Sequence, residues 1–251
     1  MAGILQNKKI KSLSLVLISL VLLTSFKFQT QTTIYIIGDS TAANKQAKAY
    51  PETGWGMKLQ SFFKESVFVD NRALNGRSTK SFLNEKQWQP IVDRLQPGDY
   101  VFIEFGHNDE KVDKPATGTS LVEFKLNLIN YVLQTRAKKA IPVLLTPISR
   151  RSFKDGKLVD THGNYPDVTR KVADSLKVPL IDMLVKTEKL LNKLGDKPSI
   201  QLFNYVDSGH VNYPAGKKDD THLSPTGAKE IAGLVVDGIK ELKLNLVKRL
   251  K

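Results

Sequence analysis

The segment Ile34-Tyr35-Ile36-Ile37-Gly38-Asp39-Ser40-Thr41 joins a run of apolar residues to a turn that contains a serine. A short continuous apolar run is typical of a strand that is buried on both faces. The glycine that follows it indicates that the chain turns there. Ser40 could simply cap a helix, which is a common role for serine after a strand. It could also act as a nucleophile, provided that a base removes its proton.

Similar apolar runs recur along the chain, and stretches with helical spacing separate them. The apolar runs are 33–37, 67–70, 100–105, 141–146 and 178–182, and the amphipathic stretches are 54–65, 88–95, 121–138 and 165–177. Ser224 followed by Pro225 predicts the start of a final helix that runs toward Leu242. This alternation predicts a doubly wound parallel sheet with helices on both faces. The polar stretch 196–220 is predicted to be a long ordered loop.

Three polar blocks directly follow the first three predicted strands. Ser40 lies in the first, Gly76 in the second, and Asn108 in the third. The carboxyl ends of parallel strands meet at one edge of a sheet, where ligands bind. A glycine N–H and an asparagine amide can both donate hydrogen bonds to an oxygen that becomes negative during acyl transfer. The alternative interpretations are an ordinary turn glycine and an asparagine that stabilises its own turn.

A candidate base lies near the C-terminus, in Asp219-Asp220-Thr221-His222. A histidine can take the proton of a serine when a carboxylate orients its ring, and Asp219 has the spacing to do so. The run Asp207-Ser208-Gly209-His210 has the same spacing. His222 is preferred because a predicted helix start follows it.

The remaining histidines and the acid beside the serine are given structural roles. We expect His107 to be a hydrogen-bonded structural histidine, His162 to be a surface loop residue, and Asp39 to shape its turn. The two Asp-x-x-His runs could also suggest metal ligands. The chain has neither a His-Glu-x-x-His motif nor cysteine, so a metal site is not predicted.

Together the four blocks resemble the SGNH (GDSL-type) hydrolase family. The pattern of that family has a serine in a Gly-Asp-Ser block, a glycine in a second block, an asparagine in a Gly-x-Asn-Asp block, and Asp-x-x-His near the C-terminus. The resemblance implies that Ser40, Asp219 and His222 form a catalytic triad. It also implies that Ser40, Gly76 and Asn108 form an oxyanion hole. It also implies a flavodoxin-like, three-layer α/β/α sandwich with a five-stranded parallel sheet, and neither a metal nor another cofactor.

Residues around these blocks narrow the resemblance. Glu52-Thr53-Gly54-Trp55-Gly56 and Asn75-Gly76-Arg77-Ser78-Thr79 are similar to the rhamnogalacturonan acetylesterase branch, carbohydrate esterase family twelve. That branch removes acetyl groups from pectin and related plant polysaccharides. Another acyl substrate, such as a thioester, a lysophospholipid or acetylated xylan, is an alternative. So is a non-catalytic glycan-binding protein, although the intact set of five residues disfavours it.

Residues 1–30 have the pattern of a signal peptide. Lys8, Lys9 and Lys11 precede an apolar run, 13–23, that is short for a membrane span. We expect cleavage between Ser25 and Gln31, with an uncleaved anchor as the alternative. The chain has no cysteine, which excludes disulfides and a cysteine-linked lipid. Residues 31–251 are predicted to be a single hydrolase domain that is secreted or periplasmic, without stable membrane insertion.

The chain is basic, with a formal net charge of +13. Residues 1–30 contain four lysines and no acidic residue, so the remainder carries +9. Such a charge suits nucleic acid, but the triad and the export signal favour an acetylated acidic polysaccharide instead. The candidate substrate-binding residues are the cations near the predicted edge of the sheet: Arg77, Arg150, Arg151, Lys217 and Lys218. An equal alternative is that these five are only solvated surface charges.

Overall fold

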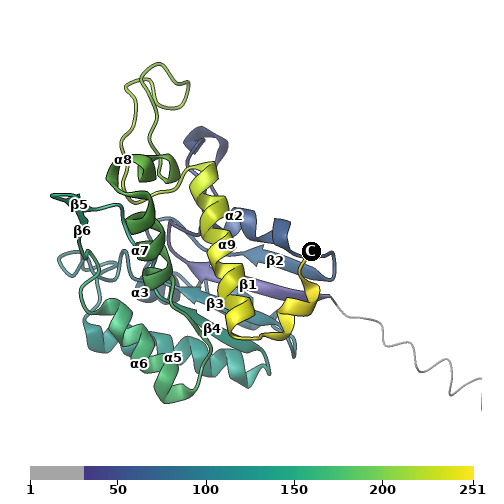
Figure 1. Ribbon diagram of the computed structural model, residues 1–251. Helices are drawn as coiled ribbons and strands as arrows, with labels where there is room; N and C mark the ends of the chain where they lie inside the picture. The colour runs from purple at the N-terminus through teal and green to yellow at the C-terminus, as the bar shows by residue number, and fades with distance from the viewer. Residues whose placement is uncertain (1–30) are drawn as a thin grey trace, which may run out of the picture. The chain divides into compact units, whose positions relative to one another are not determined.

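The computed structural model describes residues 31–251, so the predicted signal peptide lies outside the described residues. Within this part of the chain, five parallel strands form one sheet in the order β2-β1-β3-β4-β7 (Figure 1). The strands are β1 (Thr32–Gly38), β2 (Val67–Asn71), β3 (Tyr100–Glu104), β4 (Ile141–Leu145) and β7 (Leu180–Ile181). All five contain residues of the predicted apolar runs, which confirms the predicted parallel sheet.

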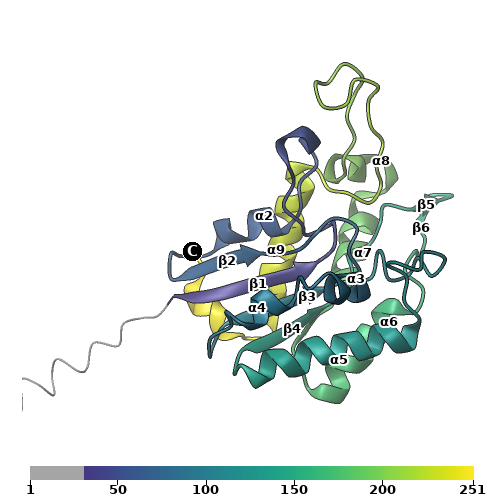
Figure 2. The same ribbon diagram turned by 180° about the vertical axis from the view of Figure 1, so that it is seen from behind.

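The helices lie in two layers. Figures 1 and 2 show α2, α7 and α9 over one face of the sheet and α4, α5 and α6 over the other. The helices are α2 (Gly56–Leu59), α3 (Thr79–Asn84), α4 (Gln89–Val92), α5 (Leu121–Ala137), α6 (Tyr165–Leu176), α7 (Met183–Leu194), α8 (Asp196–Ser199) and α9 (Pro225–Glu241). Short 3-10 helices are η1 (Ala47–Ala49), η2 (Gln60–Phe62), η3 (Ile200–Leu202) and η4 (Asn245–Arg249), and a small hairpin joins β5 (Phe153–Lys154) to β6 (Lys157–Leu158).

Strand β1 supplies apolar side chains to two separate cores. Ile34 and Ile36 pack with residues of α2, α7 and α9, whereas Tyr35 and Ile37 pack with residues of α3 to α6. Successive side chains of a strand point to opposite faces. A strand covered on both faces therefore needs an unbroken apolar run, which explains why β1 shows no alternation of polar and apolar residues.

The expected helices are confirmed in part. The stretch 54–65 contains only α2 followed by η2, and 88–95 contains only the single turn of α4. Helices α3 and α7 were not predicted. In α7 the buried residues Met183, Leu184, Thr187 and Leu191 have helical spacing, and Asp182 caps the first turn through Val185 N–H. The stretch 196–220 is largely loop, apart from α8 and η3 at its start.

The last helix begins as predicted. The Ser224 side chain accepts a hydrogen bond of 3.0 Å from the N–H of Gly227, and Pro225 occupies the first turn. Gly227 packs directly against the backbone of η3, because a Cβ atom there would lie 1.8 Å from the Leu202 carbonyl oxygen. No helix within residues 31–251 combines the length and the hydropathy needed to cross a membrane.

Two glycines of α9 provide a matched test of this packing. We expect Gly227→Ala to lower the free energy of unfolding by more than about 2 kcal/mol, because overpacked sites cost ~1–3 kcal/mol and this contact is with rigid backbone. A Cβ at Gly233 would meet only the Phe62 ring, at 3.9 Å. Gly233→Ala should therefore raise stability by up to about 1 kcal/mol through helix propensity. Urea unfolding of both variants measures the difference, and equal changes would contradict the packing argument.

Candidate active site

Three side chains from the two ends of the chain form one hydrogen-bonded series. The Nε2 atom of His222 lies 2.9 Å from the Oγ atom of Ser40, and its Nδ1 atom lies 2.8 Å from the Oδ2 atom of Asp219. Ser40 follows β1, and the other two residues precede α9. The arrangement places a serine hydroxyl, an imidazole and a carboxylate in the order that general-base activation requires.

Hydrogen bonds hold Asp219 as an anion. Burial by itself would raise the pKa of Asp219, but bonds from the His222 ring and from the N–H groups of His222 and Thr221 outweigh burial and keep the pKa well below its ordinary value. An ionised carboxylate only accepts hydrogen bonds. The Nδ1 atom of His222 therefore carries the proton, and Nε2 is left to accept the hydroxyl proton of Ser40.

The three groups predicted to form an oxyanion hole lie on the segments that follow β1, β2 and β3. Within residues 31–251, neither the Ser40 N–H nor the Gly76 N–H donates to another protein group. Gly76 has φ of +75°, in the left-handed region that favours glycine. The Asn108 carboxamide is oriented at both ends, since its Nδ2 donates to the Arg77 carbonyl at 3.0 Å and its Oδ1 accepts from Lys111 at 2.8 Å. The second Nδ2 hydrogen of Asn108 is not used by that contact.

A buried network below the serine fixes its turn. Asp39 accepts hydrogen bonds from the N–H and hydroxyl of Thr41, and the Nδ1 atom of His107 lies 3.2 Å from its second oxygen. Burial opposes its ionisation, yet His107 and Thr41 hold the pKa of Asp39 well below its ordinary value. Asp39 and His107 thus have the structural roles expected for them. Burial lowers the pKa of His107.

Glu104 at the end of β3 belongs to the same network, a role that sequence reasoning missed. Its carboxyl accepts a hydrogen bond from the Trp55 indole at 2.7 Å, and its Oε1 atom lies 3.2 Å from the hydroxyl oxygen of Thr41. Burial, with the nearby Asp39 carboxylate, raises the pKa of Glu104 to about 8. One negative charge therefore resides on Asp39 at neutral pH, and Glu104 holds a proton. The sequence signal that could have revealed this role is the position of Glu104, an acidic residue at the end of the apolar run 100–105.

The remaining histidines lie apart from the serine. His210 pairs with Tyr213 in the loop that follows η3, and no hydrogen bond joins it to Ser40. The prediction that His162 is a surface residue is wrong. Its side chain is buried, with Nδ1 2.8 Å from Glu110 and Nε2 2.9 Å from the Ile148 carbonyl oxygen. The loop around it is polar, so no local pattern distinguishes it from an exposed residue.

The structure also locates the five cations proposed for substrate binding. Four of them form ion pairs: Arg77 with Glu85, Arg150 with Glu110, Arg151 with Asp196 and Asp220, and Lys217 with Asp219. Of the five, only Lys218 forms no ion pair within the described residues, and it is exposed. The four paired cations are partly neutralised by their carboxylates. In the described part of the chain, no group of three or more His, Asp or Glu residues could hold a metal ion.

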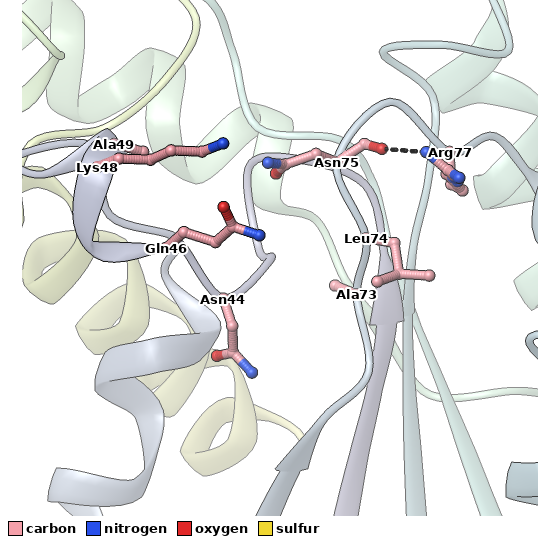
Figure 3. A pocket seen from close by; sticks show the side chains of 8 residues that line it. All are labelled: Asn44, Gln46, Lys48, Ala49, Ala73, Leu74, Asn75 and Arg77. Carbon is pink, nitrogen blue, oxygen red and sulfur yellow. Dashed lines mark hydrogen bonds between the residues drawn. The ribbon is translucent and has the colours of Figure 1, made fainter.

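A cavity of about 370 Å³ adjoins the Gly76 turn (Figure 3). This volume lies within the ~300–1,000 Å³ typical of ligand sites. Figure 3 shows Gln46 and Lys48 on one side and Asn75 on the other, with the Lys48 side chain extended toward Asn75. The lining is rich in amides and cations and includes a small apolar surface: Asn44, Gln46, Lys48, Ala49, Ala73, Leu74, Asn75 and Arg77.

Known proteins share both the sequence pattern and the fold. Residues 36–230 match the model of the GDSL-like lipase/acylhydrolase family. The chain is 40% identical over 215 residues to the rhamnogalacturonan acetylesterase RhgT of Bacillus subtilis, covering 85% of this chain and 91% of that protein. It is 34% identical to the probable rhamnogalacturonan acetylesterase YesY of the same organism, covering 85% and 94%. The crystal structure of B. subtilis YxiM superposes with a TM-score of 0.75 and 27% identity, covering 86% of this chain and 58% of that one.

The raised pKa of Glu104 predicts a pH dependence of stability. An unfolded glutamate has a pKa of about 4.3, so between that pH and about 8 the folded protein keeps a proton that the unfolded chain has lost. Stability should therefore fall as pH rises through this window, by at most ~1.4 kcal/mol per pH unit for this group. Glu104→Gln imitates the protonated acid, so its stability should fall less steeply between pH 5 and pH 8.

Urea unfolding of the parent and of Glu104→Gln at pH 5, 6.5 and 8 measures both slopes. Burial also raises the pKa of Asp109, to about 7, so part of the dependence should survive in the variant. Parallel slopes for the two proteins would mean that Glu104 is already ionised at neutral pH.

Proposed function

This chain belongs to the GDSL-like lipase/acylhydrolase family and is a carboxylic ester hydrolase, and we propose that it removes acetyl groups from an acidic plant polysaccharide of the rhamnogalacturonan type. The observation that carries the proposal is the series Ser40–His222–Asp219, with spacings of 2.9 and 2.8 Å, beside two unengaged backbone N–H groups. Its relatives RhgT and YesY are named for rhamnogalacturonan deacetylation, which supports the substrate class.

In the proposed acylation step, Nε2 of His222 takes the hydroxyl proton of Ser40 as Oγ attacks the acetyl carbonyl carbon. Asp219 stabilises the imidazolium that forms, because its carboxylate already accepts the Nδ1 hydrogen bond. The carbonyl oxygen becomes an oxyanion and receives hydrogen bonds from the Ser40 N–H, the Gly76 N–H and the Asn108 amide. Imidazolium then protonates the sugar oxygen, the ester bond breaks, and the deacetylated sugar leaves.

In the proposed deacylation step, water replaces the sugar hydroxyl. His222 takes a proton from the water, and the resulting nucleophile attacks the acetyl-Ser40 carbonyl. The same donors stabilise the second oxyanion. Return of the proton to Oγ of Ser40 releases acetate and regenerates the enzyme. The side chain of His222 is 29% exposed, which leaves its ring accessible to both sugar and water.

The cavity beside Gly76 suits a neighbouring sugar residue of the substrate. Its amide side chains can form hydrogen bonds with sugar hydroxyl groups, and Lys48 forms no ion pair within the described residues. We therefore assign the attraction for a uronate carboxylate to Lys48, because Arg150 and Arg151 are paired with acids. A polysaccharide substrate also fits the proposed export of the protein, for which the lysines and apolar run of residues 1–30 are the support.

The triad assignment makes a direct prediction. Ser40→Ala and His222→Ala should each abolish hydrolysis of 4-nitrophenyl acetate, with a loss of at least ~10⁴-fold, while thermal unfolding remains close to that of the parent. His210→Ala, in the other Asp-x-x-His run, is the matched control and should keep near-parent activity. A normal rate in His222→Ala together with loss in His210→Ala would reverse the choice of base.

The assignment of Lys48 predicts a selective loss. Lys48→Gln should raise KM for acetylated rhamnogalacturonan about two- to fivefold, since an exposed charge pair contributes up to ~1 kcal/mol. Hydrolysis of 4-nitrophenyl acetate should not change. In the parent, the polymer reaction should weaken as salt rises, because exposed charges are screened beyond ~8 Å at physiological ionic strength.

Lys125→Gln is the control, since this residue is exposed on α5 and does not line the cavity. Equal effects of the two substitutions would show that Lys48 contributes only to overall charge. A panel of acetylated pectin, acetylated xylan and rhamnogalacturonan, with acetate release as the measurement, tests the substrate class itself. Preference for xylan would overturn it.

A further inference from the structure

A buried lysine lies directly behind the nucleophile. The side chain of Lys45 is only 2% exposed, although lysine is rarely buried unless it is paired. Its Nζ atom donates to the Ser40 carbonyl oxygen at 2.6 Å and to the Asn75 Oδ1 atom at 2.7 Å, and it pairs with Glu52 at 2.7 Å. These three contacts account for all three ammonium hydrogens. The nucleophile turn, the Gly76 turn and the loop before α2 therefore meet at one cation.

Two of these contacts hold backbone that carries proposed oxyanion donors. Ser40 contributes its own N–H, and Asn75 shares a peptide group with the N–H of Gly76. The carbonyl of that peptide group accepts a hydrogen bond of 3.0 Å from the Arg77 guanidinium, drawn as a dashed line in Figure 3. The Arg77 carbonyl in turn accepts from Asn108. A continuous series of hydrogen bonds thus connects all three donors, with Lys45 between the first two.

We propose that Lys45 is a positioning residue that holds the Ser40 and Gly76 N–H groups at the spacing that a single oxyanion requires. The Gly76 turn needs such support, because its left-handed glycine has no side chain and a Cβ there would meet no atom within 4 Å. Donors must lie within ~2.7–3.1 Å of the oxyanion, and a misplacement of ~1 Å can cost ~10²-fold in rate. The inference rests on the proposed hydrolysis at Ser40.

The competing explanation is that Lys45 and Glu52 form an ion pair with only a structural role. Breaking a buried pair leaves one charge uncompensated and destabilises the fold. Removing both charges should restore stability under either explanation. Only the positioning role predicts that the rate stays low when stability has been restored, because the bonds to Ser40 and Asn75 remain absent.

The experiment compares Lys45→Met, Glu52→Gln and the double variant, with 4-nitrophenyl acetate as substrate and urea unfolding for stability. Lys45→Met keeps an unbranched side chain without hydrogen-bond donors. We expect kcat to fall ~10–100-fold, with KM changed less than threefold. Glu52→Gln should remain near the parent in kcat. The double variant should regain stability relative to Lys45→Met but keep its low kcat.

A second readout does not depend on the natural substrate. A fluorophosphonate phosphonylates the serine with loss of fluoride, and the negative charge that develops on its phosphoryl oxygen is stabilised by the same donors. Mass spectrometry should therefore show ~10–100-fold slower labelling of Ser40 in Lys45→Met. Normal labelling of the parent without turnover of any polysaccharide would contradict the proposed substrate and leave the role of Lys45 standing. Asn75→Ala removes only the hydrogen bond from Lys45 to the Gly76 turn and leaves the ion pair with Glu52 in place, so it should lower kcat in the same direction even if Lys45→Met fails to fold.

Either of two results would overturn the proposal. The first is a kcat of at least half the parent value in a folded Lys45→Met protein. The second is recovery of both kcat and stability in the double variant, which would leave Lys45 as a structural ion pair. A double-mutant cycle of Lys45→Met with Asn75→Ala should show non-additive losses, because the two residues act through one contact.

Discussion

Parallel pairing of β1 with both β2 and β3 is the constraint on which the candidate site depends. Ile36 pairs with Asn71 of β2, and Gly38 pairs with Glu104 of β3, so the carboxyl ends of three strands lie at one edge. Strands β1 and β3 approach each other so closely at this point that a Cβ atom on Gly38 would lie 2.6 Å from the Glu104 carbonyl oxygen. Segments that follow these strands therefore emerge at the same edge, and these segments carry Ser40, Gly76 and Asn108, the three donors of the proposed oxyanion hole.

Buried ionisable groups then fix the turn that the strands bring into place. Asp39 is ionised and Glu104 is protonated at neutral pH, since two adjacent buried carboxylates do not readily ionise together. Hydrogen bonds from Thr41 and Trp55 satisfy these acids, and Lys45 satisfies the carbonyl of Ser40 on the other side. The serine is thus held by polar contacts made before any substrate binds, which is how a preorganised site lowers the cost of developing charge.

Net charge is a poor guide to the surface of this protein. Most of the cations that flank the candidate site are paired with carboxylates, and one of them, Arg77, supports the Gly76 turn through its hydrogen bond to Asn75. Fewer cationic residues are therefore available to attract an acidic polymer than the formal charge suggests. In the proposed function, Lys48 and the amides of the cavity beside the Gly76 turn, rather than the whole basic surface, bind the acidic sugar.

The sequence by itself determined the strands, the long helices α5, α6 and α9, and the blocks that follow the strands, because buried strands, helix caps and tight turns depend on neighbouring residues. It also predicted the series Ser40, Asp219 and His222, through spacing and family resemblance. The tertiary structure shows that His222, the base preferred from the sequence, contacts Ser40. It alone decided that His162 is buried and that Lys45 joins two turns. These contacts link residues up to 182 positions apart. Such contacts depend on how the strands pair and on how the loops pack against one another, so a local pattern in the sequence does not predict them.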